Sequence, residues 1–320
     1  MPLPSFGLMS KHSPTRRLRE MSKARFLVVV AVTVGMLSYT AVGFGADPHA
    51  APFLRMGVGA RALAMGGAFT AIADDATAAY WNPAGLVKIE NIEATFMYAA
   101  NMAVDRQLNY FAYTQWLGMG GLGISWLNAG MADVPKYDGS GNYLGSDDIG
   151  DNAIMFSYGM EVGSLMLGAS AKILHEDVMG TTETGFGLDL GGMFNVTDNV
   201  TAGIMIRDVG SQYGDVDVPI DWRFGTAVRA LDDALVIGLD VDKVQDIDNF
   251  VVHLGAEYGM EVHPGYYTFF RMGFNSVEDK AFTTGLGIRV PYVQFDYSYI
   301  TEPDEDVFGN SHRISITARF

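Results

Sequence analysis

The sequence of 320 residues contains no cysteine, so it can form neither disulfide bonds nor thiolate metal sites. It also lacks an excess of positive charge: 21 Lys and Arg stand against 37 Asp and Glu, for a formal net charge of −16. A protein that binds nucleic acid needs a basic surface to neutralise phosphates. The composition therefore excludes nucleic acid as a partner.

Patterns that carry enzyme chemistry are missing as well. The six histidines are scattered without the spacing of a metal site, and the chain has no Gly-x-Ser-x-Gly nucleophile motif. Residues 118–123 fit the Gly-x-Gly-x-x-Gly pattern, but a strand pattern follows them, whereas a dinucleotide site needs a helix there. We therefore expect no catalytic, metal-binding or cofactor-binding residue, and a protein that is not an enzyme.

One long apolar run is present, at residues 26–37, after Lys23 and Arg25 and before a run of small residues near Gly43. This order predicts an N-terminal extension plus a secretory signal peptide within residues 1–45, with either Met1 or Met21 as the start. A permanent anchor helix is the alternative. No later run is long enough for a membrane helix, so the remaining chain is either a secreted soluble protein or a membrane barrel.

From residue 92 onward, apolar and polar residues alternate with the period of two that is typical of strands. In residues 282–290 every second residue from Phe282 is mostly apolar, whereas Thr283 and Arg289 belong to the opposite face. The last strand alternates in the same way up to Phe320. Each segment has about the eight to eleven residues that a tilted membrane strand needs. The fourteen predicted strands are 92–100, 107–117, 120–128, 152–160, 165–174, 184–194, 200–207, 222–230, 234–241, 250–258, 266–274, 281–290, 292–300 and 313–320.

The connections between these strands alternate in length, which favours a barrel over a soluble β-sandwich. Long polar connections are expected at 101–106, 129–151, 175–183, 208–221, 242–249, 275–280 and 301–312, and mostly tight ones between them, except 259–265. We therefore expect residues 92–320 to form an all-β, 14-stranded antiparallel transmembrane barrel in the bacterial outer membrane. Outer-membrane lipid is then its partner, both termini are periplasmic, and Phe320 is the barrel-closing signal.

Two further residue types refine the predicted wall. Aromatic residues near strand ends, among them Tyr98, Tyr110 and Trp126, predict interfacial girdles. Clustered glycines at Gly118, Gly120, Gly121 and Gly123 predict a bend in the wall. Other glycines fall on the inward face and leave room there for curvature or for a plug: Gly168, Gly187, Gly203, Gly225, Gly238, Gly255, Gly273, Gly285 and Gly287.

Residues 46–91 differ from the barrel, because they are rich in Gly and Ala and do not alternate. Asp74 is expected to cap a short helix that ends at Trp81, since a carboxylate suits a helix N-terminus and Pro83 and Gly85 stop a helix. We expect this segment to form a hatch at the periplasmic mouth or inside the lumen.

Residues 53–69 and 73–86 resemble the N-terminal signature of the PorV/PorQ family, which is similar to the FadL-type transporters of hydrophobic solutes. The resemblance implies a fourteen-stranded barrel with a hatch. For the PorV type it implies a carrier or scaffold in type IX protein secretion, with secreted proteins or their C-terminal signal domains as partners. For the FadL type it implies uptake of a hydrophobic ligand. The hatch residues that it implies are Arg55, Gly57, Arg61, Met65, Gly66, Gly67, Asp74, Asp75, Trp81, Asn82, Pro83 and Gly85.

Overall fold

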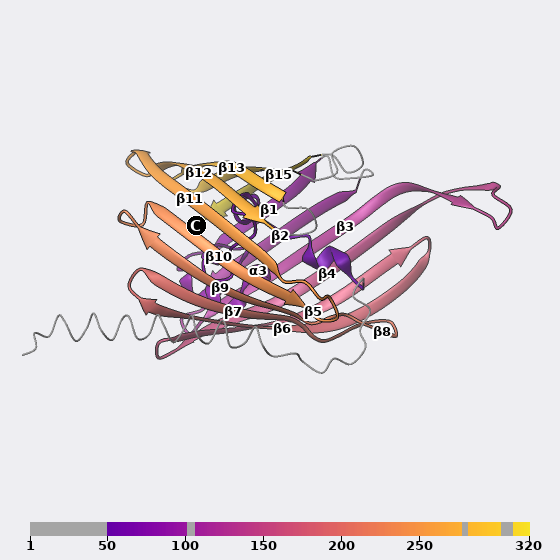
Figure 1. Ribbon diagram of the computed structural model, residues 1–320, viewed down its shortest axis with the longest axis horizontal. Coiled ribbons are helices and arrows are strands. Elements are labelled where there is room, and N and C mark those ends of the chain that lie inside the picture. The colour runs from indigo at the N-terminus through magenta and orange to yellow at the C-terminus, as the bar shows by residue number, and fades with distance from the viewer. Residues whose placement is uncertain (1–49, 101–105, 277–280, 302–309) are drawn as a thin grey trace, which may run out of the picture. The chain divides into compact units, whose positions relative to one another are not determined.

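The computed structural model describes residues 50–100, 106–276, 281–301 and 310–320 (Figure 1). The predicted signal peptide, within residues 1–45, lies outside the described residues. In the ranges that are described, no helix is both long and apolar enough to cross a membrane.

Fourteen antiparallel strands form one closed ring. Each strand pairs with the strands next to it along the chain, and the pairing of the first strand with the last closes the ring. The additional strand β8 (Val216–Asp217) pairs only with β7. The all-β, closed 14-stranded barrel is thus confirmed. Its strands are β1 (Glu93–Ala100), β2 (Gln107–Trp116), β3 (Gly121–Tyr137), β4 (Tyr143–Val162), β5 (Leu165–Val178), β6 (Thr181–Thr197), β7 (Val200–Tyr213), β9 (Asp221–Ala230), β10 (Leu235–Val244), β11 (Val251–His263), β12 (Tyr266–Asn275), β13 (Ala281–Val290), β14 (Val293–Ile300) and β15 (Ser311–Arg319).

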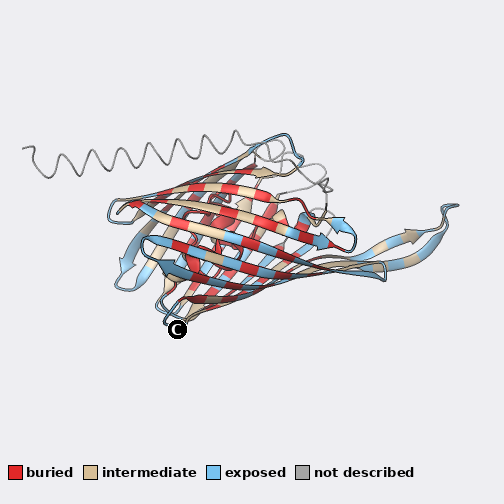
Figure 2. Ribbon diagram, turned by 90° about the horizontal axis from the view of Figure 1, so that it is seen from below, coloured by how far each residue is buried: buried red, intermediate tan, exposed pale blue. Residues whose placement is uncertain are grey.

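The wall is taller on one side than the sequence suggests. Residues 129–151, expected as a loop, are mostly strand, because β3 and β4 pair as far as Tyr137 and Tyr143. The resulting hairpin projects past the other strands (Figures 1 and 2). Strand also replaces much of the predicted connections at 175–183, 208–221 and 259–265. Both faces of the extensions at 129–151, 175–183 and 259–265 are mostly polar or exposed, so the alternation that marks a half-buried strand is missing there.

Burial alternates along the strands, as the bands of Figure 2 show. On β13, Phe282 and Ile288 are 62% and 57% exposed, whereas Thr283 between them is 5% exposed. Apolar side chains of the later strands point out of the ring and polar ones point into it, as the sequence predicted.

The first strands depart from this rule on their inner face. Met97, Leu108, Tyr110 and Leu127 are buried in one apolar cluster with the N-terminal segment (residues 50–91). The prediction of an interfacial girdle is therefore wrong for Tyr110, which is fully buried. Tyr98 and Trp126 are exposed, as residues of a girdle should be.

The N-terminal segment holds four short helices. Helix η1 spans Pro52–Arg55, α2 spans Ala60–Ala64, α3 spans Ala78–Trp81 and η2 spans Pro83–Lys88. Helix α2 contacts β12–β15, while η2 contacts β2–β6. Since these strands lie in different parts of the ring, the segment reaches from one part of the inner wall to another.

A band of inward-facing glycines lets the backbone of the N-terminal segment lie directly on the wall. Ten consecutive strands, from β3 to β13 without the short β8, each supply one such glycine. A Cβ atom added at any of them would lie 2.1 to 2.8 Å from an atom of the segment. Real Cβ atoms do not approach so closely, so only glycine fits. The glycine band consists of Gly121, Gly159, Gly168, Gly191, Gly203, Gly225, Gly238, Gly255, Gly273 and Gly285.

The variant Gly255→Ala tests this contact. Its methyl group would lie 2.3 Å from the Met65 carbonyl oxygen, so we expect a destabilisation of about 1–3 kcal/mol, the usual cost of overpacking. The measurement is the temperature at which the folded barrel loses its heat-dependent gel mobility. Gly150→Ala on β4 is the matched control, because nothing lies within 4 Å of the Cβ atom there. Equal transition temperatures for the two variants would contradict the account.

Candidate functional site: the N-terminal segment and its seat in the barrel

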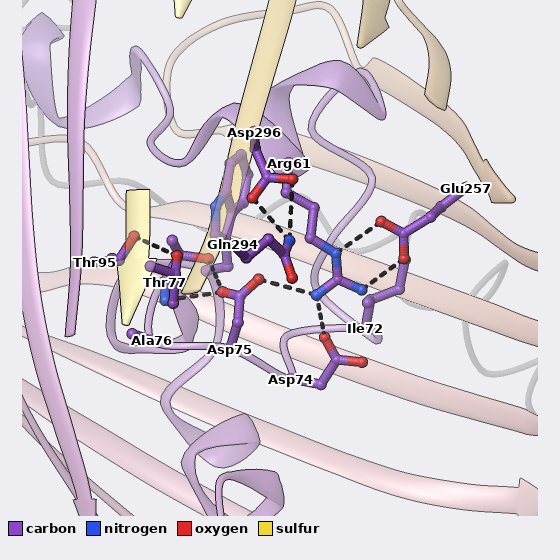
Figure 3. Close-up of polar contacts among 12 residues, drawn as sticks. Arg61, Ile72, Asp74, Asp75, Ala76, Thr77, Thr95, Glu257, Gln294 and Asp296 are labelled. Atoms are coloured by element: carbon purple, nitrogen blue, oxygen red, sulfur yellow. Dashed lines mark hydrogen bonds and ion pairs between the residues drawn. The ribbon is translucent and has the colours of Figure 1, made fainter. Parts of the chain in front are cut away.

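Arg61 of α2 is the charged centre of the segment (Figure 3). Its Nη1 atom lies 2.6 Å from a carboxylate oxygen of Asp74 and 3.0 Å from one of Asp75. Its Nε and Nη2 atoms donate to the two oxygens of Glu257 on β11, at 2.9 and 2.8 Å. One guanidinium therefore fixes the fold of the segment and also joins the segment to the wall.

The segment's charged groups shift one another's pKa. Burial by itself would lower the pKa of Arg61, but Asp74 and Glu257 hold it well above its usual range. Burial would raise the pKa of Asp74, but Arg61, Lys88 and Arg229 hold it well below its usual range. Burial lowers the pKa of Lys88 to about 8, although Asp74 opposes that change. At neutral pH the pair of Arg61 and Asp74 is therefore fully ionised.

Ion pairs continue from this centre around the inner wall. Glu257 also accepts from Nε of Arg271 on β12 at 2.5 Å, and Nη1 of Arg271 lies 2.8 Å from Asp296 on β14. On the other side, Asp74 lies 3.0 Å from Nη2 of Arg229 on β9. The network thus connects the segment to four strands through charges that are largely removed from water.

Polar side chains of the wall satisfy backbone groups of the segment. Asp240 accepts the amide hydrogens of Phe69 and Thr70 at 3.0 and 2.9 Å. Strands β1, β13 and β15 add further contacts: Glu93 accepts from the Ala76 amide, Thr283 accepts from the Gly66 amide and donates to the Ala64 carbonyl, and Ser315 accepts from the Ala60 amide. Irregular backbone can be buried in the barrel because these groups pair with it.

The aromatic core of the segment is stacked against arginines of the wall. Trp81 donates its Nε1 hydrogen to the Val58 carbonyl at 2.9 Å and meets Phe69 and Tyr80 edge to face. The guanidinium groups of Arg207 and Arg223 lie 5.6 and 5.3 Å from its ring. Trp81 is therefore held on several sides, and it is 3% exposed.

A second row of charges, the ion ladder, crosses β5, β6, β7, β9 and β10 beside this core. Lys172 pairs with Asp189 and Asp208, Arg207 approaches Asp221, and Arg223 pairs with Asp242. Strand β7 bulges here, since its register against β6 shifts between Leu188 and Leu190, opposite Val209 and Ile206. Asp208 at this bulge has a φ of 61°, and its amide donates to Asp189.

The structure brings together several of the predicted hatch residues. Arg61, Asp74 and Asp75 form the charged centre, and Asn82 caps η2 by accepting from the Ala84 amide. Asp74 does not cap α3, which begins at Ala78; its neighbour Asp75 accepts from the amide and hydroxyl of Thr77 instead. The other residues shape the segment: Arg55 and Pro83 lie in its 3₁₀ helices, Met65 is fully buried, Gly57, Gly66 and Gly67 have positive φ, and Gly85 packs on the Ala73 carbonyl.

The four glycines of the predicted wall bend lie at the start of β3 and in the turn before it. Gly118 and Gly120 belong to the turn between β2 and β3, and Gly121 and Gly123 belong to β3. At Gly121 and Gly123, strand β3 pairs in unbroken register with both β2 and β4. The strand pairing is regular at these glycines, and the wall bend stays a prediction. The bulge of β7 is the irregularity nearest to the ion ladder.

Phe320 follows β15, is 72% exposed and exchanges two backbone hydrogen bonds with Ile92. It thus lies where the ring closes, and its role as a barrel-closing signal stays a prediction. No group of three or more His, Cys, Asp or Glu side chains is placed to hold a metal ion in the part of the chain that the structure describes. What the interior offers is charge, hydrogen bonds and aromatic surface.

Sequence reasoning missed the wall side of this site. Glu257 and Asp240 lie far along the chain from their partners in the segment. Like Arg271 and Asp296, which extend the network on the wall, each reads locally as one more polar residue on an alternating strand. The signal that could have found them is the presence of charged residues on a face that is also lined by glycines, since glycine there indicates a backbone close by.

Comparison with known proteins supports the fold. The model of an uncharacterised protein family, UPF0164, matches residues 44–209. Among solved structures, the chain is similar to the CymD monoaromatic hydrocarbon channel, with 14% identity, a TM-score of 0.61 and coverage of 82% of this chain and 98% of that one. The Ralstonia pickettii toluene transporter TbuX is 15% identical, with a TM-score of 0.60 and coverage of 82% of this chain and 98% of that one. A Pseudomonas aeruginosa FadL homologue is 12% identical, with a TM-score of 0.52 and coverage of 79% of this chain and 95% of that one. None of the curated proteins has a significant sequence match to the chain.

Arg61→Met tests the charged centre. This substitution removes the charge and leaves three carboxylates close together. We therefore expect the free energy of unfolding to fall by about 3–5 kcal/mol, as for other broken buried ion pairs. Limited proteolysis of the folded barrel should then cut the segment faster while the strands stay protected. Lys136→Met is the control, because its pair with Asp147 lies on the projecting hairpin. Equal cleavage of both variants would contradict the role of Arg61.

The pH dependence gives a separate prediction. Because the folded-state pKa of Asp74 lies below its ordinary value of 3.8, this group contributes stability that is present above pH 3.8 and is lost as the pH falls further. Proteolysis of the segment should therefore accelerate in acid, and Asp74→Asn should flatten that dependence. An acid response that is identical in wild type and Asp74→Asn would refute this assignment.

Proposed function

The chain belongs to the uncharacterised protein family UPF0164, and we propose that it is an outer-membrane barrel that passes hydrophobic small molecules. One observation carries the proposal: a closed ring of strands is apolar outside, and its interior holds an ordered segment and many buried charges. Such a ring leaves no backbone group unpaired towards lipid. The proposed role is not enzymatic.

The outer surface supports the membrane location. Phe295, Leu286 and Ile316, on three neighbouring strands, are 52%, 52% and 41% exposed, whereas Asp296 and Ser315 next to them are 4% and 3% exposed. A water-soluble barrel would place such apolar side chains inside. Lipid on the outside makes their exposure favourable. Strands of eight to ten residues on this side fit a tilted crossing of the hydrocarbon layer.

The structures of similar fold support hydrophobic passage. Those reported above are named as a monoaromatic hydrocarbon channel, a toluene transporter and a FadL homologue, and the match covers nearly all of each. This supports the FadL-type expectation over the PorV-type role in type IX secretion, which stays a prediction without a specific observation in its favour. In this proposal the short turns and both termini face the periplasm, and the N-terminal segment is the hatch.

A disulfide tests passage and hatch together. In Ala79→Cys/Gly123→Cys, the two Cβ atoms would lie 3.3 Å apart, near the usual span of a disulfide, and no native cysteine can compete. Expressed in a Gram-negative host, the reduced variant should increase uptake of radiolabelled toluene over cells without the protein. The oxidised variant should not, because the segment is then tied to β3.

Each single-cysteine variant serves as a control for this test, since oxidation should leave its uptake unchanged. Equal uptake by the oxidised and reduced double variants would overturn the hatch. Uptake that never depends on the protein would overturn the channel.

A further inference from the structure

Polar atoms without partners gather on the inner face of β7 and on its neighbour β9. They are Nε and Nη2 of Arg207, Oγ of Ser211, the hydroxyl of Tyr213 and Oδ1 of Asp221, and no hydrogen-bond partner among the described residues reaches them. The four side chains are only 4%, 2%, 8% and 1% exposed. Burying such groups without a partner is costly, and most buried polar atoms in folded proteins have one.

Arg207 and Asp221 lie opposite each other on neighbouring strands. The two residues are register partners across β7 and β9, and Nη1 lies 3.7 Å from Oδ2, beyond hydrogen-bond distance. The guanidinium is stacked 4.6 Å over the ring of Tyr80. Its Nε and Nη2 hydrogens, which form one edge of the guanidinium, remain to donate, and Oδ1 of Asp221 remains to accept.

Charge decides which chemical group fits there. The ion ladder already sets four carboxylates, those of Asp189, Asp208, Asp221 and Asp242, against three cations. A further anion would lie beside this excess of carboxylates, and a further cation would lie beside Arg207. A neutral group that both accepts and donates avoids both costs, and a hydroxyl is the smallest such group.

Aromatic rings of the segment lie against this pair. The Arg207 guanidinium is 4.6 Å from the ring of Tyr80 and 5.6 Å from that of Trp81, and both rings belong to the buried apolar cluster. Val218 is 3% exposed, and its amide donates to the Ser211 carbonyl at 2.9 Å. This hydrogen bond continues the pairing of β8 with β7 and holds Val218 beside Ser211. An occupant must be mostly apolar, with one polar group directed at Arg207 and Asp221.

We propose that Arg207 and Asp221 bind the hydroxyl group of an otherwise apolar ligand, such as an alkylphenol, with Ser211 and Tyr213 providing further hydrogen bonds along β7. The ligand hydroxyl accepts from Arg207 and donates to Asp221. This inference rests on the proposed passage of hydrophobic molecules and narrows its substrate class to hydroxyl-bearing ones.

The test compares the binding of 4-ethylphenol and ethylbenzene to the full-length protein in detergent by calorimetry. The two probes differ only in the hydroxyl, so we expect a preference for 4-ethylphenol of at least about ten-fold. Arg207→Lys keeps the charge but removes the guanidinium edge, and it should reduce this preference several-fold while ethylbenzene binding stays the same. Arg289→Lys is the matched control, because Arg289 also stacks on a tyrosine ring, 4.1 Å from that of Tyr267.

Tyr213→Phe and Ser211→Ala cover the case in which Arg207→Lys fails to fold. Each removes a hydroxyl that has no partner, so neither should destabilise the protein, and each should lower the affinity for 4-ethylphenol two- to five-fold, about the value of one weak hydrogen bond. Tyr258→Phe, on the outer face, should change nothing.

The outcomes separate this inference from the proposed function. Equal affinity of the wild type for the two probes overturns the hydroxyl site but leaves hydrophobic passage standing. The hydroxyl site is likewise overturned, with hydrophobic passage left standing, if Arg207→Lys, Tyr213→Phe and Ser211→Ala all keep the wild-type preference for 4-ethylphenol over ethylbenzene. Binding of neither probe overturns the site and also counts against the channel.

Discussion

The close contact between two backbones, that of the N-terminal segment and that of the wall, is the constraint on which the interior depends. Ten strands meet the segment through glycine, and side chains on these positions would displace it. Because the backbones lie so close, short wall side chains such as Ser315 and Thr283 reach the amides of the segment directly. The close contact and the hydrogen bonding are therefore two results of the same geometry.

Charge gives this contact a fixed position. A buried ion pair gains little net stability, since desolvation offsets much of the attraction, but a mispaired buried charge is strongly unfavourable. Arg61 meets three carboxylates from two parts of the chain, so a displaced segment would leave several charges unpaired at once. Movement of the proposed hatch consequently requires water or a ligand to replace these contacts.

Most of the fold could be predicted from the sequence because one face of nearly every strand is apolar and exposed. The same reasoning failed where that condition ends. Residues 129–151 carry polar groups on both faces, so their strands were expected as a loop. On β2 the inner face is apolar because it packs against the segment, so Tyr110 was assigned to the wrong side.

The site itself could be predicted only in part. The glycines of the inner face indicated room for a plug, and the motif around Asp74 and Asn82 indicated an ordered segment. The pairing of Arg61 with Glu257 spans 196 residues and depends on the register of β11 in the closed ring. No local pattern encodes such a contact, and the bulge of β7 at Asp208 likewise has no signal in the alternation.

The most direct test of the central claim asks what touches the outside of the ring. Spin labels on single cysteines placed at Leu286, Phe295 and Ile316 of the reconstituted protein should collide with oxygen dissolved in lipid and be shielded from a water-soluble nickel complex. A label at Asp138 on the projecting hairpin should show the opposite. Nickel accessibility at the three outer positions equal to that at Asp138 would mean that water surrounds the ring, and the account would be wrong.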